Sequence, residues 1–331
     1  MSQLKIGING LGRIGRLFFR YGFDSLNVVA VNGKSSEEMA SHLLQYDSVH
    51  GVWDKKVQAQ SRSLLVDKKS VAYFQKDHPS EIPWDDYDVD IVVDCTGRFK
   101  TQDDLKKHLS KKVKMVLVSA PAPQADFHLV YGVNQNLFQK DKHQIISNTS
   151  CTTNCLAPLI KVFQEKWGIE KGFMTTVHSY TNDQNLLDSS HRDLRRARTA
   201  ALNMIPTTTG AGKALSLIFP ELKGKIKGSS VRVPVANVSL VDLTLEIQKE
   251  ATAKQINEHF KKAAQTDLKN ILAVEEGALV SSDFIGRKES SILDALSTEV
   301  LEDRLVKVLS WYDNEAGFSQ RMVDFIHFVN N

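Results

Sequence analysis

The sequence predicts an α/β protein with two domains: a doubly wound parallel sheet over residues 1–150, and an α+β domain with a mixed or antiparallel sheet over residues 151–316. Two observations predict this division. Short apolar runs alternate with helical patterns in the first half, whereas the second half has longer strands of alternating polarity. A length of 331 residues is also sufficient for two hydrophobic cores.

The first half contains compact apolar runs that end in small or polar residues, as buried parallel strands do. These runs alternate with helical patterns, so we expect helices on both faces of the sheet. The predicted strands are Leu4–Ile8, Val28–Val31, Ile91–Asp94 and Val116–Val118, and the clearest predicted helix is Ile14–Tyr21.

The second half opens with one long helical pattern, Thr152–Trp167. Its strands alternate polar and apolar residues, which is typical of a sheet with one exposed face. Thr252–Gln265 is an amphipathic helix, because Ile256 and Phe260 recur at helical spacing. We expect a last helix, over residues 317–331, to pack back on the first domain. The predicted strands are Met174–Ser179, Ser229–Pro234, Val238–Gln248 and Val306–Tyr312.

Composition and charge are ordinary for a globular protein, with 42% hydrophobic and 24% charged residues. The formal net charge of +3 demands no polyanion, so nucleic acid is not expected as a primary partner. No apolar run reaches the roughly 18 residues of a membrane span, and the N-terminus has no signal-peptide pattern. The three cysteines, Cys95, Cys151 and Cys155, indicate a reducing compartment. We expect a cytoplasmic protein without a metal site, because no ligands occur at metal spacing.

Gly10, Gly12 and Gly15 form a GxGxxG pattern that follows a strand and opens a helix. The first glycine permits a tight turn, the second lets the backbone approach a pyrophosphate, and the third lets the helix pack close to the sheet. The phosphates then lie at the helix N-terminus, where N–H groups favour anions. The pattern predicts a Rossmann-type dinucleotide site.

The end of the second strand lacks the acid that binds the adenine ribose hydroxyls in such sites. Gly33, Lys34, Ser35 and Ser36 follow Asn32 there. A carboxylate would repel a 2′-phosphate, whereas a cation and hydroxyl groups would hold one. The segment therefore indicates NADP, or tolerance of both cofactors, although the same residues also suit an ordinary solvated turn.

Cys151 follows small polar residues and begins an apolar helix. A thiol at a helix N-terminus has a lowered pKa, which favours the nucleophilic thiolate. Cys155 lies one turn later, and we interpret it as a buried small hydrophobe. His178, at the end of a predicted strand, is the candidate base for Cys151. The alternative for His178 is a structural histidine, and its spacing alone does not select it among 10 histidines.

The segment Ser150-Cys151-Thr152-Thr153-Asn154-Cys155 strongly resembles the active-site motif of phosphorylating glyceraldehyde-3-phosphate dehydrogenases. Further segments match family signatures in family order. They are Asn9–Arg16, Tyr46–Ser48, Ser119–Pro121, Thr175–His178, Asp193–Arg198, Ser281–Phe284 and Trp311–Glu315.

The resemblance implies that Cys151 attacks an aldehyde, that His178 takes the proton, and that inorganic phosphate releases the resulting thioester as an acyl phosphate. Both substrate and attacking phosphate need an anion site, and arginine suits both. The alternative for the arginines of residues 192–198 is a solvated basic face. Thr181, Asp183 and Arg232 match the substrate-phosphate site, and Ser150, Thr152, Arg196, Thr209 and Gly210 match the attacking-phosphate site.

For the cofactor, the resemblance adds positions at the pyrophosphate turn, near the adenine and along the nicotinamide half. They are Arg13, Ile14, Lys76, Thr96, Gly97, Ser119 and Asn314. Two departures favour NADP, with NAD still accepted. Gly33 stands where the family usually has Asp, and Ser189 and Ser190 replace the Leu-Pro of NAD-specific members. In NADP-accepting members of the family, the serine that matches Ser190 reaches the 2′-phosphate of a cofactor bound to the neighbouring subunit. The resemblance therefore implies a homotetramer.

Three other functions compete with this interpretation. Erythrose-4-phosphate dehydrogenase shares the fold, the Cys–His pair and the cofactor, and the motifs do not separate it. A binding protein, whose dinucleotide groove would capture RNA or a protein partner, has little support, because the net charge is small and basic and aromatic residues do not interleave. A redox sensor would use an oxidisable Cys151, which we interpret as a consequence of the catalytic design.

Overall fold

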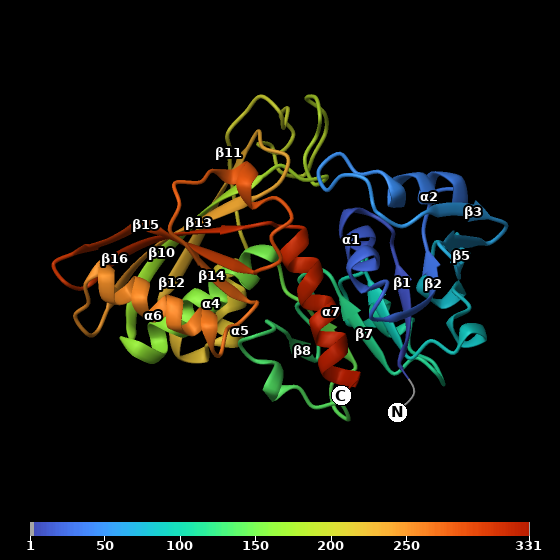
Figure 1. Cartoon of the computed structure of the whole chain (residues 1–331), viewed down its shortest axis with the longest axis horizontal. Coiled ribbons are helices and arrows are strands. Elements are labelled where there is room, and N and C mark those ends of the chain that lie inside the picture. Colours follow the sequence, from blue (N-terminus) through green and yellow to red (C-terminus); the bar gives the residue numbers. More distant parts are fainter. Residues whose placement is uncertain (1–2, 331) are drawn as a thin grey trace. The chain divides into compact units, whose positions relative to one another are not determined.

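A nine-stranded sheet organises the first half of the chain in the computed structural model, which describes residues 3–330 (Figure 1). Its strand order is β3-β4-β5-β2-β1-β6-β7-β9-β8. The strands from β5 to β8 pair in parallel, and β3 and β4 form an antiparallel extension. The strands are β1 (Lys5–Asn9), β2 (Asn27–Asn32), β3 (Val57–Gln60), β4 (Ser63–Val66), β5 (Lys69–Phe74), β6 (Ile91–Asp94), β7 (Met115–Val118), β8 (Phe127–His128) and β9 (Ile145–Ser147).

The central strands of this sheet are apolar because both of their faces are covered. All four residues of β6 and of β7 are buried. The predicted parallel sheet is confirmed, but β3, β4, β5, β8 and β9 were not predicted. In β3, three of the four residues are exposed and give no periodic signal. The helices of this half are α1 (Arg13–Gly22), α2 (Glu37–Gln45) and α3 (Gln102–Lys106).

A seven-stranded mixed sheet organises the second half, in the order β11-β12-β10-β13-β16-β15-β14. Pairs β10–β12 and β14–β15 are parallel, and the other pairs are antiparallel. Strand β13 alternates buried and half-buried residues along its length, as predicted for a sheet with one covered face. The strands are β10 (Ile169–Ser179), β11 (Ile205–Thr207), β12 (Ile226–Val233), β13 (Ser239–Ile247), β14 (Leu272–Glu275), β15 (Ser291–Leu301) and β16 (Leu305–Tyr312).

Helices α4 (Cys151–Lys166), α5 (Ala211–Ile218) and α6 (Ala253–Gln265) lie on one face of this sheet (Figure 1). Helix α6 begins with a capping box, in which the Thr252 hydroxyl accepts from the Gln255 N–H and the Gln255 side chain accepts from the Thr252 N–H. Inside α6, Ile256 and Phe260 are fully buried, so the predicted apolar face is the one that packs.

The chain divides into two compact units. One runs to Ser150 and includes the residues from Ser319 onward, and the other is Cys151–Phe318. The last helix, α7 (Ala316–Asn330), crosses from the second unit to the first. Within the first unit its Phe325 ring lies edge-on to Phe138, with centroids 5.1 Å apart. Among residues 3–330, no helix is long and apolar enough to cross a membrane.

A buried polar network ties together the ends of β1, β2 and β6 in the first unit. The Asn9 amide donates to Asp94 at 2.8 Å, and the Asn32 amide donates to the Asn9 carbonyl oxygen at 2.9 Å. The Trp84 indole N–H donates to His108 Nδ1 at 3.1 Å, so His108 Nε2 carries the proton and faces Asp94 at 3.2 Å. Asp94 and His108 are almost fully buried, and each depends on the other.

We expect His108→Leu to lower the free energy of unfolding by about 3 kcal/mol, because it leaves the Trp84 N–H without an acceptor and removes one donor from the buried Asp94 carboxylate. Urea denaturation measures the change. The matched control is His78→Leu at an exposed histidine of the same unit, which should change stability by less than about 0.5 kcal/mol. Equal effects of the two substitutions would contradict the structural role of the network.

Candidate active site

Cys151 is the first residue of α4, and its Sγ lies 3.5 Å from Nε2 of His178 near the end of β10. Thr149, just before the helix, has a φ of 57°, a left-handed conformation that a β-branched residue rarely adopts. Such strain is characteristic of turns that hold a reactive group in place. The structure therefore brings together the nucleophile and the base that the sequence predicted.

His178 and Arg232 are register neighbours on the parallel strands β10 and β12. The Arg232 guanidinium lies against the histidine ring, with Nη1 2.8 Å from Nδ1 and 2.9 Å from the Ser179 carbonyl oxygen. Because arginine has no acceptor, and the Nδ1 of His178 lies 2.7 Å from the same carbonyl, both groups donate to Ser179. This tautomer leaves the Nε2 lone pair free to accept the proton of the Cys151 thiol.

Burial and the Arg232 charge lower the pKa of His178 to about 3, so the imidazole is neutral at physiological pH. A neutral imidazole can act as a base. Burial also raises the pKa of the Cys151 thiol, although Arg232 and the hydrogen bonds from Thr152 act in the opposite direction. The predicted lowering of this pKa is therefore wrong for the resting site, because desolvation outweighs the groups that favour the thiolate.

The Arg232 side chain offers an unused donor. Among the residues that the structure describes, its buried Nε has no hydrogen-bond partner. Its Nη1 also lies 3.4 Å from the Thr181 hydroxyl. A half-buried guanidinium with a free N–H, next to a hydroxyl, can hold a phosphate oxygen. The structure thus brings Thr181 and Arg232 together.

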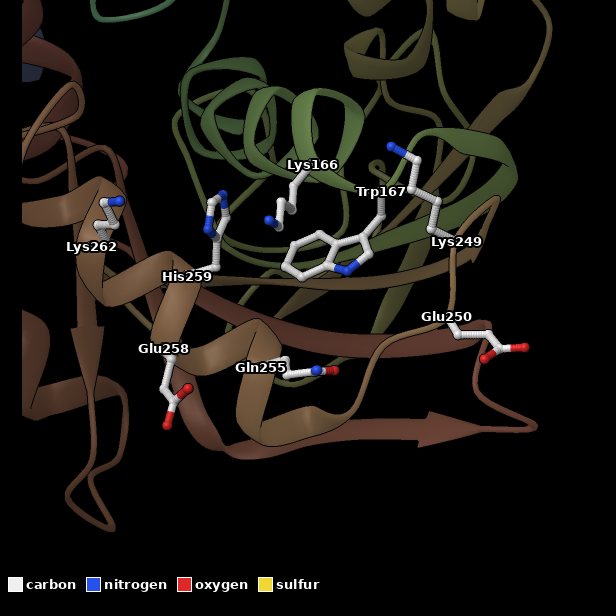
Figure 2. A pocket seen from close by; sticks show the side chains of 8 residues that line it. All are labelled: Lys166, Trp167, Lys249, Glu250, Gln255, Glu258, His259 and Lys262. Atoms are coloured by element: carbon white, nitrogen blue, oxygen red, sulfur yellow. The ribbon is translucent and has the colours of Figure 1, made fainter.

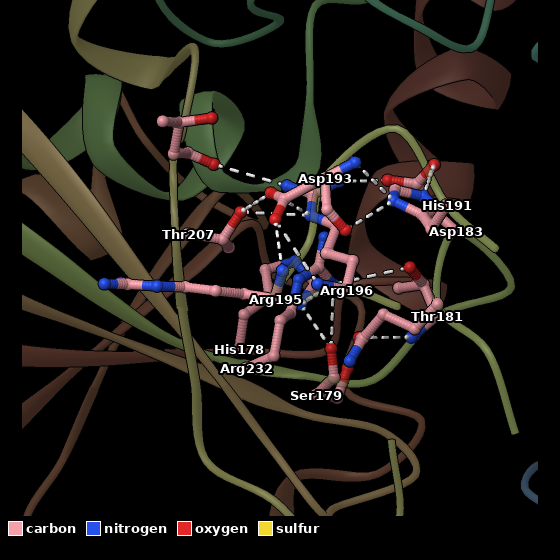
Figure 3. Close-up of polar contacts among 12 residues, drawn as sticks. His178, Ser179, Thr181, Asp183, His191, Asp193, Arg195, Arg196, Thr207 and Arg232 are labelled. Atoms are coloured by element: carbon pink, nitrogen blue, oxygen red, sulfur yellow. Dashed lines mark hydrogen bonds and ion pairs between the residues drawn. The ribbon is translucent and has the colours of Figure 1, made fainter. Parts of the chain in front are cut away.

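Arg196 belongs to a cluster of polar contacts that also includes Asp183, Asp193 and Thr207 (Figure 3). It forms an ion pair with Asp183 and donates from Nε to the Thr207 hydroxyl at 3.0 Å, and its Nε lies 3.6 Å from Asp193. From the family resemblance, Asp183 was expected to hold the substrate phosphate together with Thr181 and Arg232. In the structure the Asp183 carboxylate contacts Arg196 instead, and it positions that arginine.

The neighbouring arginines have partners of other kinds. Arg198 pairs with Asp188 at the exposed surface, and Arg195 donates to the Pro206 carbonyl oxygen at 3.4 Å. Of these three arginines, only Arg196 has its side chain in the cluster near His178. The positive charge of Arg196 also lowers the pKa of His178.

The four other positions of the matched attacking-phosphate site differ in their surroundings. Gly210 directly precedes α5, and the Thr209 hydroxyl accepts from the Ala211 N–H at 3.2 Å, so both lie at a helix N-terminus that suits an anion. Thr152 is buried, and its hydroxyl lies 3.0 Å from that of Tyr312. Thr152 therefore packs in the interior and stabilises the start of α4. Ser150 directly precedes Cys151 in the chain.

Asn314 follows β16 and is held by two serines. The Ser179 and Ser239 hydroxyls donate to its Oδ1, at 2.9 and 3.1 Å. Because the carbonyl end is fixed in this way, the amide nitrogen is the end that can donate to a ligand. This orientation fits a residue that holds a carboxamide oxygen.

The glycine turn of the first unit has the form that a pyrophosphate requires. Gly10 has a φ of 99°, and a Cβ at Gly15 would lie 1.9 Å from the Gly10 carbonyl oxygen, so neither position accepts a side chain. At Gly12 a Cβ would meet nothing, which leaves open space above the N-terminus of α1. Arg13, the first residue of α1, pairs with Asp47, and Ile14 follows it in the helix.

A cavity of about 300 Å³ adjoins this turn in the first unit. Three basic side chains and one acid line it: Lys34, Lys76 and Arg98, with Asp77. The other predicted cofactor residues around it are Gly10, Gly12, Gly33, Ser35 and Thr96. The residues present therefore fit a dinucleotide, and Arg98 is a cation that was not predicted from the sequence.

The remaining nicotinamide-side positions of the first unit lie at the ends of β6 and β7. Asp94 Oδ1 accepts from both the N–H and the hydroxyl of Thr96, at 3.0 and 2.7 Å. Gly97 has a φ of 65°, and the Ser119 N–H donates to the Asp94 carbonyl oxygen at 2.9 Å. Asp94 thus organises this edge, although the sequence analysis gave it no role.

Another pocket, of about 520 Å³, lies between the end of α4 and the start of α6 (Figure 2). It is lined by Trp167 and His259 together with positively charged lysines and negatively charged glutamates. None of the predicted site residues lines it. It therefore contributes nothing to the chemistry at Cys151. Among residues 3–330, no group of three His, Cys, Asp or Glu side chains could hold a metal ion.

Tyr312 is a further site residue that escaped the sequence analysis. Its hydroxyl lies 3.0 Å from that of Thr152 and 2.8 Å from that of Thr176, and its ring stands edge-on to His178. It therefore links α4 to the strand that carries the base. The segment 311–315 was recognised as a signature, but only the contacts reveal what its tyrosine does. The predicted burial of Cys155 is confirmed.

A thiol with a histidine base, two arginines beside it and a dinucleotide turn in the same chain define an NAD(P)-dependent aldehyde dehydrogenase of the thiol type. Residues 4–102 match the family model of the glyceraldehyde 3-phosphate dehydrogenase NAD-binding domain, and residues 150–314 match that of its C-terminal domain. The chain therefore belongs to the glyceraldehyde 3-phosphate dehydrogenase family.

The similarity to individual members extends over nearly the full length. The chain is 52% identical over 329 residues to glyceraldehyde-3-phosphate dehydrogenase 1 of Bacillus cereus, which covers 99% of this chain and 98% of that protein. It is 51% identical over 328 residues to glyceraldehyde-3-phosphate dehydrogenase of Geobacillus stearothermophilus, covering 98% of each chain. Glyceraldehyde-3-phosphate dehydrogenase 2 of Bacillus subtilis is 50% identical over 329 residues, 99% of this chain and 97% of that protein.

We expect His178→Asn to lower kcat for aldehyde oxidation at least about a hundredfold, because the thiol proton loses its acceptor. Steady-state rates measure the loss, and the rate of Cys151 alkylation by iodoacetamide should fall as well. Cys151→Ala should abolish the reaction, whereas Cys155→Ala should retain it. Unchanged turnover in His178→Asn, or appreciable turnover in Cys151→Ala, would contradict the assignment of the pair.

Proposed function

We propose that this protein oxidises glyceraldehyde 3-phosphate and phosphorylates the product, in a reversible reaction that gives 1,3-bisphosphoglycerate. The observation that carries the proposal is the Cys151–His178 contact of 3.5 Å beside Arg232, whose buried Nε has no partner among the described residues. The contact supplies a nucleophile and its base, and the arginine supplies a place for a phosphate. The names of the relatives support the same substrate.

In the first step, the proton of the Cys151 thiol passes to His178 Nε2 as the sulfur attacks the aldehyde carbon. The carbonyl oxygen becomes an oxyanion, which the resulting imidazolium and the nearby Arg232 stabilise. Because the pKa of free His178 is low, the imidazolium is stable only while it faces negative charge. The proton is therefore held where the oxyanion forms.

When bound, a nicotinamide cofactor would supply the acceptor for the hydride that leaves the same carbon. As the oxyanion collapses to the carbonyl of the thioester, His178 releases its proton to solvent and is again neutral. Cys151 then carries a thioester. The Asn314 amide, whose carbonyl end is fixed by Ser179 and Ser239, would hold the carboxamide of the nicotinamide ring and so select the ring face.

In the last step, an oxygen of inorganic phosphate attacks the thioester carbon and expels the Cys151 sulfur. The proton of the phosphate passes to the thiolate, so the thiol is restored and an acyl phosphate leaves. We assign the substrate phosphate to Thr181 and Arg232, and the attacking phosphate to Arg196, Thr209 and Gly210. Two cationic side chains support two anion positions.

For the cofactor, we propose a preference for NADP with NAD still accepted. Gly33 removes the acid that would repel a 2′-phosphate. The cavity beside the glycine turn is lined by Lys34, Lys76 and Arg98 against the single acid Asp77, which supports binding of an additional phosphate.

A homotetramer is the assembly that we propose. Within residues 180–204, five large apolar side chains are between 72% and 86% exposed, which is unusual for a surface that remains in water. They are Leu186, Leu187, Leu194, Leu202 and Met204. Ser189 and Ser190 are exposed in the same segment and could reach a cofactor of a neighbouring subunit only in such an assembly. We also propose a cytoplasmic location, which the three free cysteines support.

We expect a higher kcat/KM with NADP than with NAD when initial rates are measured on glyceraldehyde 3-phosphate plus phosphate. The reason is that the residues after β2 include the cation Lys34 and have Gly33 in place of the usual acid, which favours a 2′-phosphate. A preference for NAD would contradict the cofactor proposal and leave the Cys151 chemistry intact. Erythrose 4-phosphate is the control aldehyde, with and without phosphate. Faster turnover on erythrose 4-phosphate would overturn the substrate assignment.

A further inference from the structure

The space next to Gly33 is filled by Tyr73, a side chain on the neighbouring strand β5. A Cβ at position 33 would lie 2.3 Å from the Tyr73 hydroxyl oxygen and 3.0 Å from its Cζ. Carbon atoms do not approach other heavy atoms so closely, so any side chain at position 33 would have to displace the phenol. Gly33 and Tyr73 therefore form a complementary pair.

We propose that Tyr73 determines cofactor specificity, by occupying the place of the acidic side chain and shaping the turn after β2 to receive a 2′-phosphate. This inference rests on the proposed preference for NADP. It adds that Gly33 alone does not set the preference, because the phenol excludes the acid and organises the groups that replace it.

Tyr73 is rigidly held, so it does not simply move away. Its side chain is 2% exposed, and its residue pairs with Val31 in the parallel ladder of β2 and β5. Its backbone N–H donates to the Arg62 carbonyl oxygen at 2.9 Å. Displacement of the ring would require repacking of the sheet edge, since buried aromatic side chains fill their space closely.

The Tyr73 hydroxyl also fixes the shape of the turn. It donates to the Ser35 carbonyl oxygen at 2.9 Å, and the Gln75 amide donates to the same oxygen at 2.9 Å. The Gly33 N–H donates to the Phe74 carbonyl oxygen at 2.9 Å. These bonds turn the Ser35 carbonyl, which would repel an anion, toward β5.

The donors that remain in the turn suit a phosphate. Within the part of the chain that the structure describes, the N–H groups of Lys34 and Ser35 donate no hydrogen bond, and the Lys34 ammonium forms no ion pair. Lys34 and Ser35 line the same cavity as Lys76 and Arg98. A phosphate monoester on the ribose is the ligand class that backbone N–H groups, a hydroxyl and cations recognise together.

The test is a double-mutant cycle between positions 33 and 73, with dissociation constants for NAD and NADP and the thermal midpoint measured for each full-length protein. Gly33→Asp alone should weaken both cofactors at least about tenfold and lower the midpoint, because the new side chain meets the phenol. Adding Tyr73→Ser should restore NAD binding but not NADP binding, and the two substitutions together should lower the midpoint by less than the sum of their separate effects.

A conservative variant separates the hydroxyl from the ring. Tyr73→Phe should weaken NADP about fivefold and leave NAD nearly unchanged, because only the bond to Ser35 is lost. The matched control is Tyr87→Phe at an exposed tyrosine of the same unit, which should change neither affinity. If Tyr73→Ser does not fold, the cycle of Gly33→Ala with Tyr73→Phe replaces it, and the phenylalanine should relieve part of the loss.

The result that overturns the proposal is a Gly33→Asp protein that binds NAD well at an unchanged thermal midpoint, with additive effects in the cycle. If the parent protein binds NAD more tightly than NADP, the preference for NADP fails. In that case, strong coupling between positions 33 and 73 still supports the claim that Tyr73 excludes an acidic side chain at position 33. If the two positions are not coupled, that claim is overturned as well.

Discussion

The parallel pairing of β10 with β12 is the constraint on which the reactive centre depends. It makes His178 and Arg232 neighbours, and it buries a cation against a neutral imidazole. Burial is the larger cause of the lowered pKa of His178, and the pairing adds the charge of Arg232 to it. Together they lower the pKa of His178 to about 3, and the nitrogen that faces Cys151 is kept free for a proton.

The cost of burying Arg232 is offset by the anions that the reaction brings. The resting site holds a guanidinium with one unpartnered donor and a protonated thiol, so it is complementary to a phosphate and to an oxyanion that are absent from the free protein. Asp183 and Asp193 form ion pairs with Arg196 and hold its guanidinium in place before any phosphate binds. Charge is thus arranged in advance of the substrate.

The sequence predicts the strands that are apolar on both faces, such as β6, because continuous burial leaves an unmistakable run. It also predicts Cys151 and the glycine turn, since a helix start and a GxGxxG pattern are local signals. It does not predict contacts between distant segments. Tyr73 and Gly33 are 40 residues apart in the chain, and the role of Tyr312 depends on Thr152 and Thr176. The raised pKa of Cys151 also escaped prediction, because desolvation depends on packing that only the fold determines.

The central claim is that the aldehyde carbon of the substrate is oxidised while it is bound to the Cys151 sulfur. Intact-protein and peptide mass spectrometry after one turnover without phosphate tests it most directly. We predict one 3-phosphoglyceroyl group per chain on the peptide that contains Cys151, and its loss when phosphate is added. An unmodified Cys151 peptide after cofactor has been reduced, or an acyl group that phosphate does not release, would contradict the account.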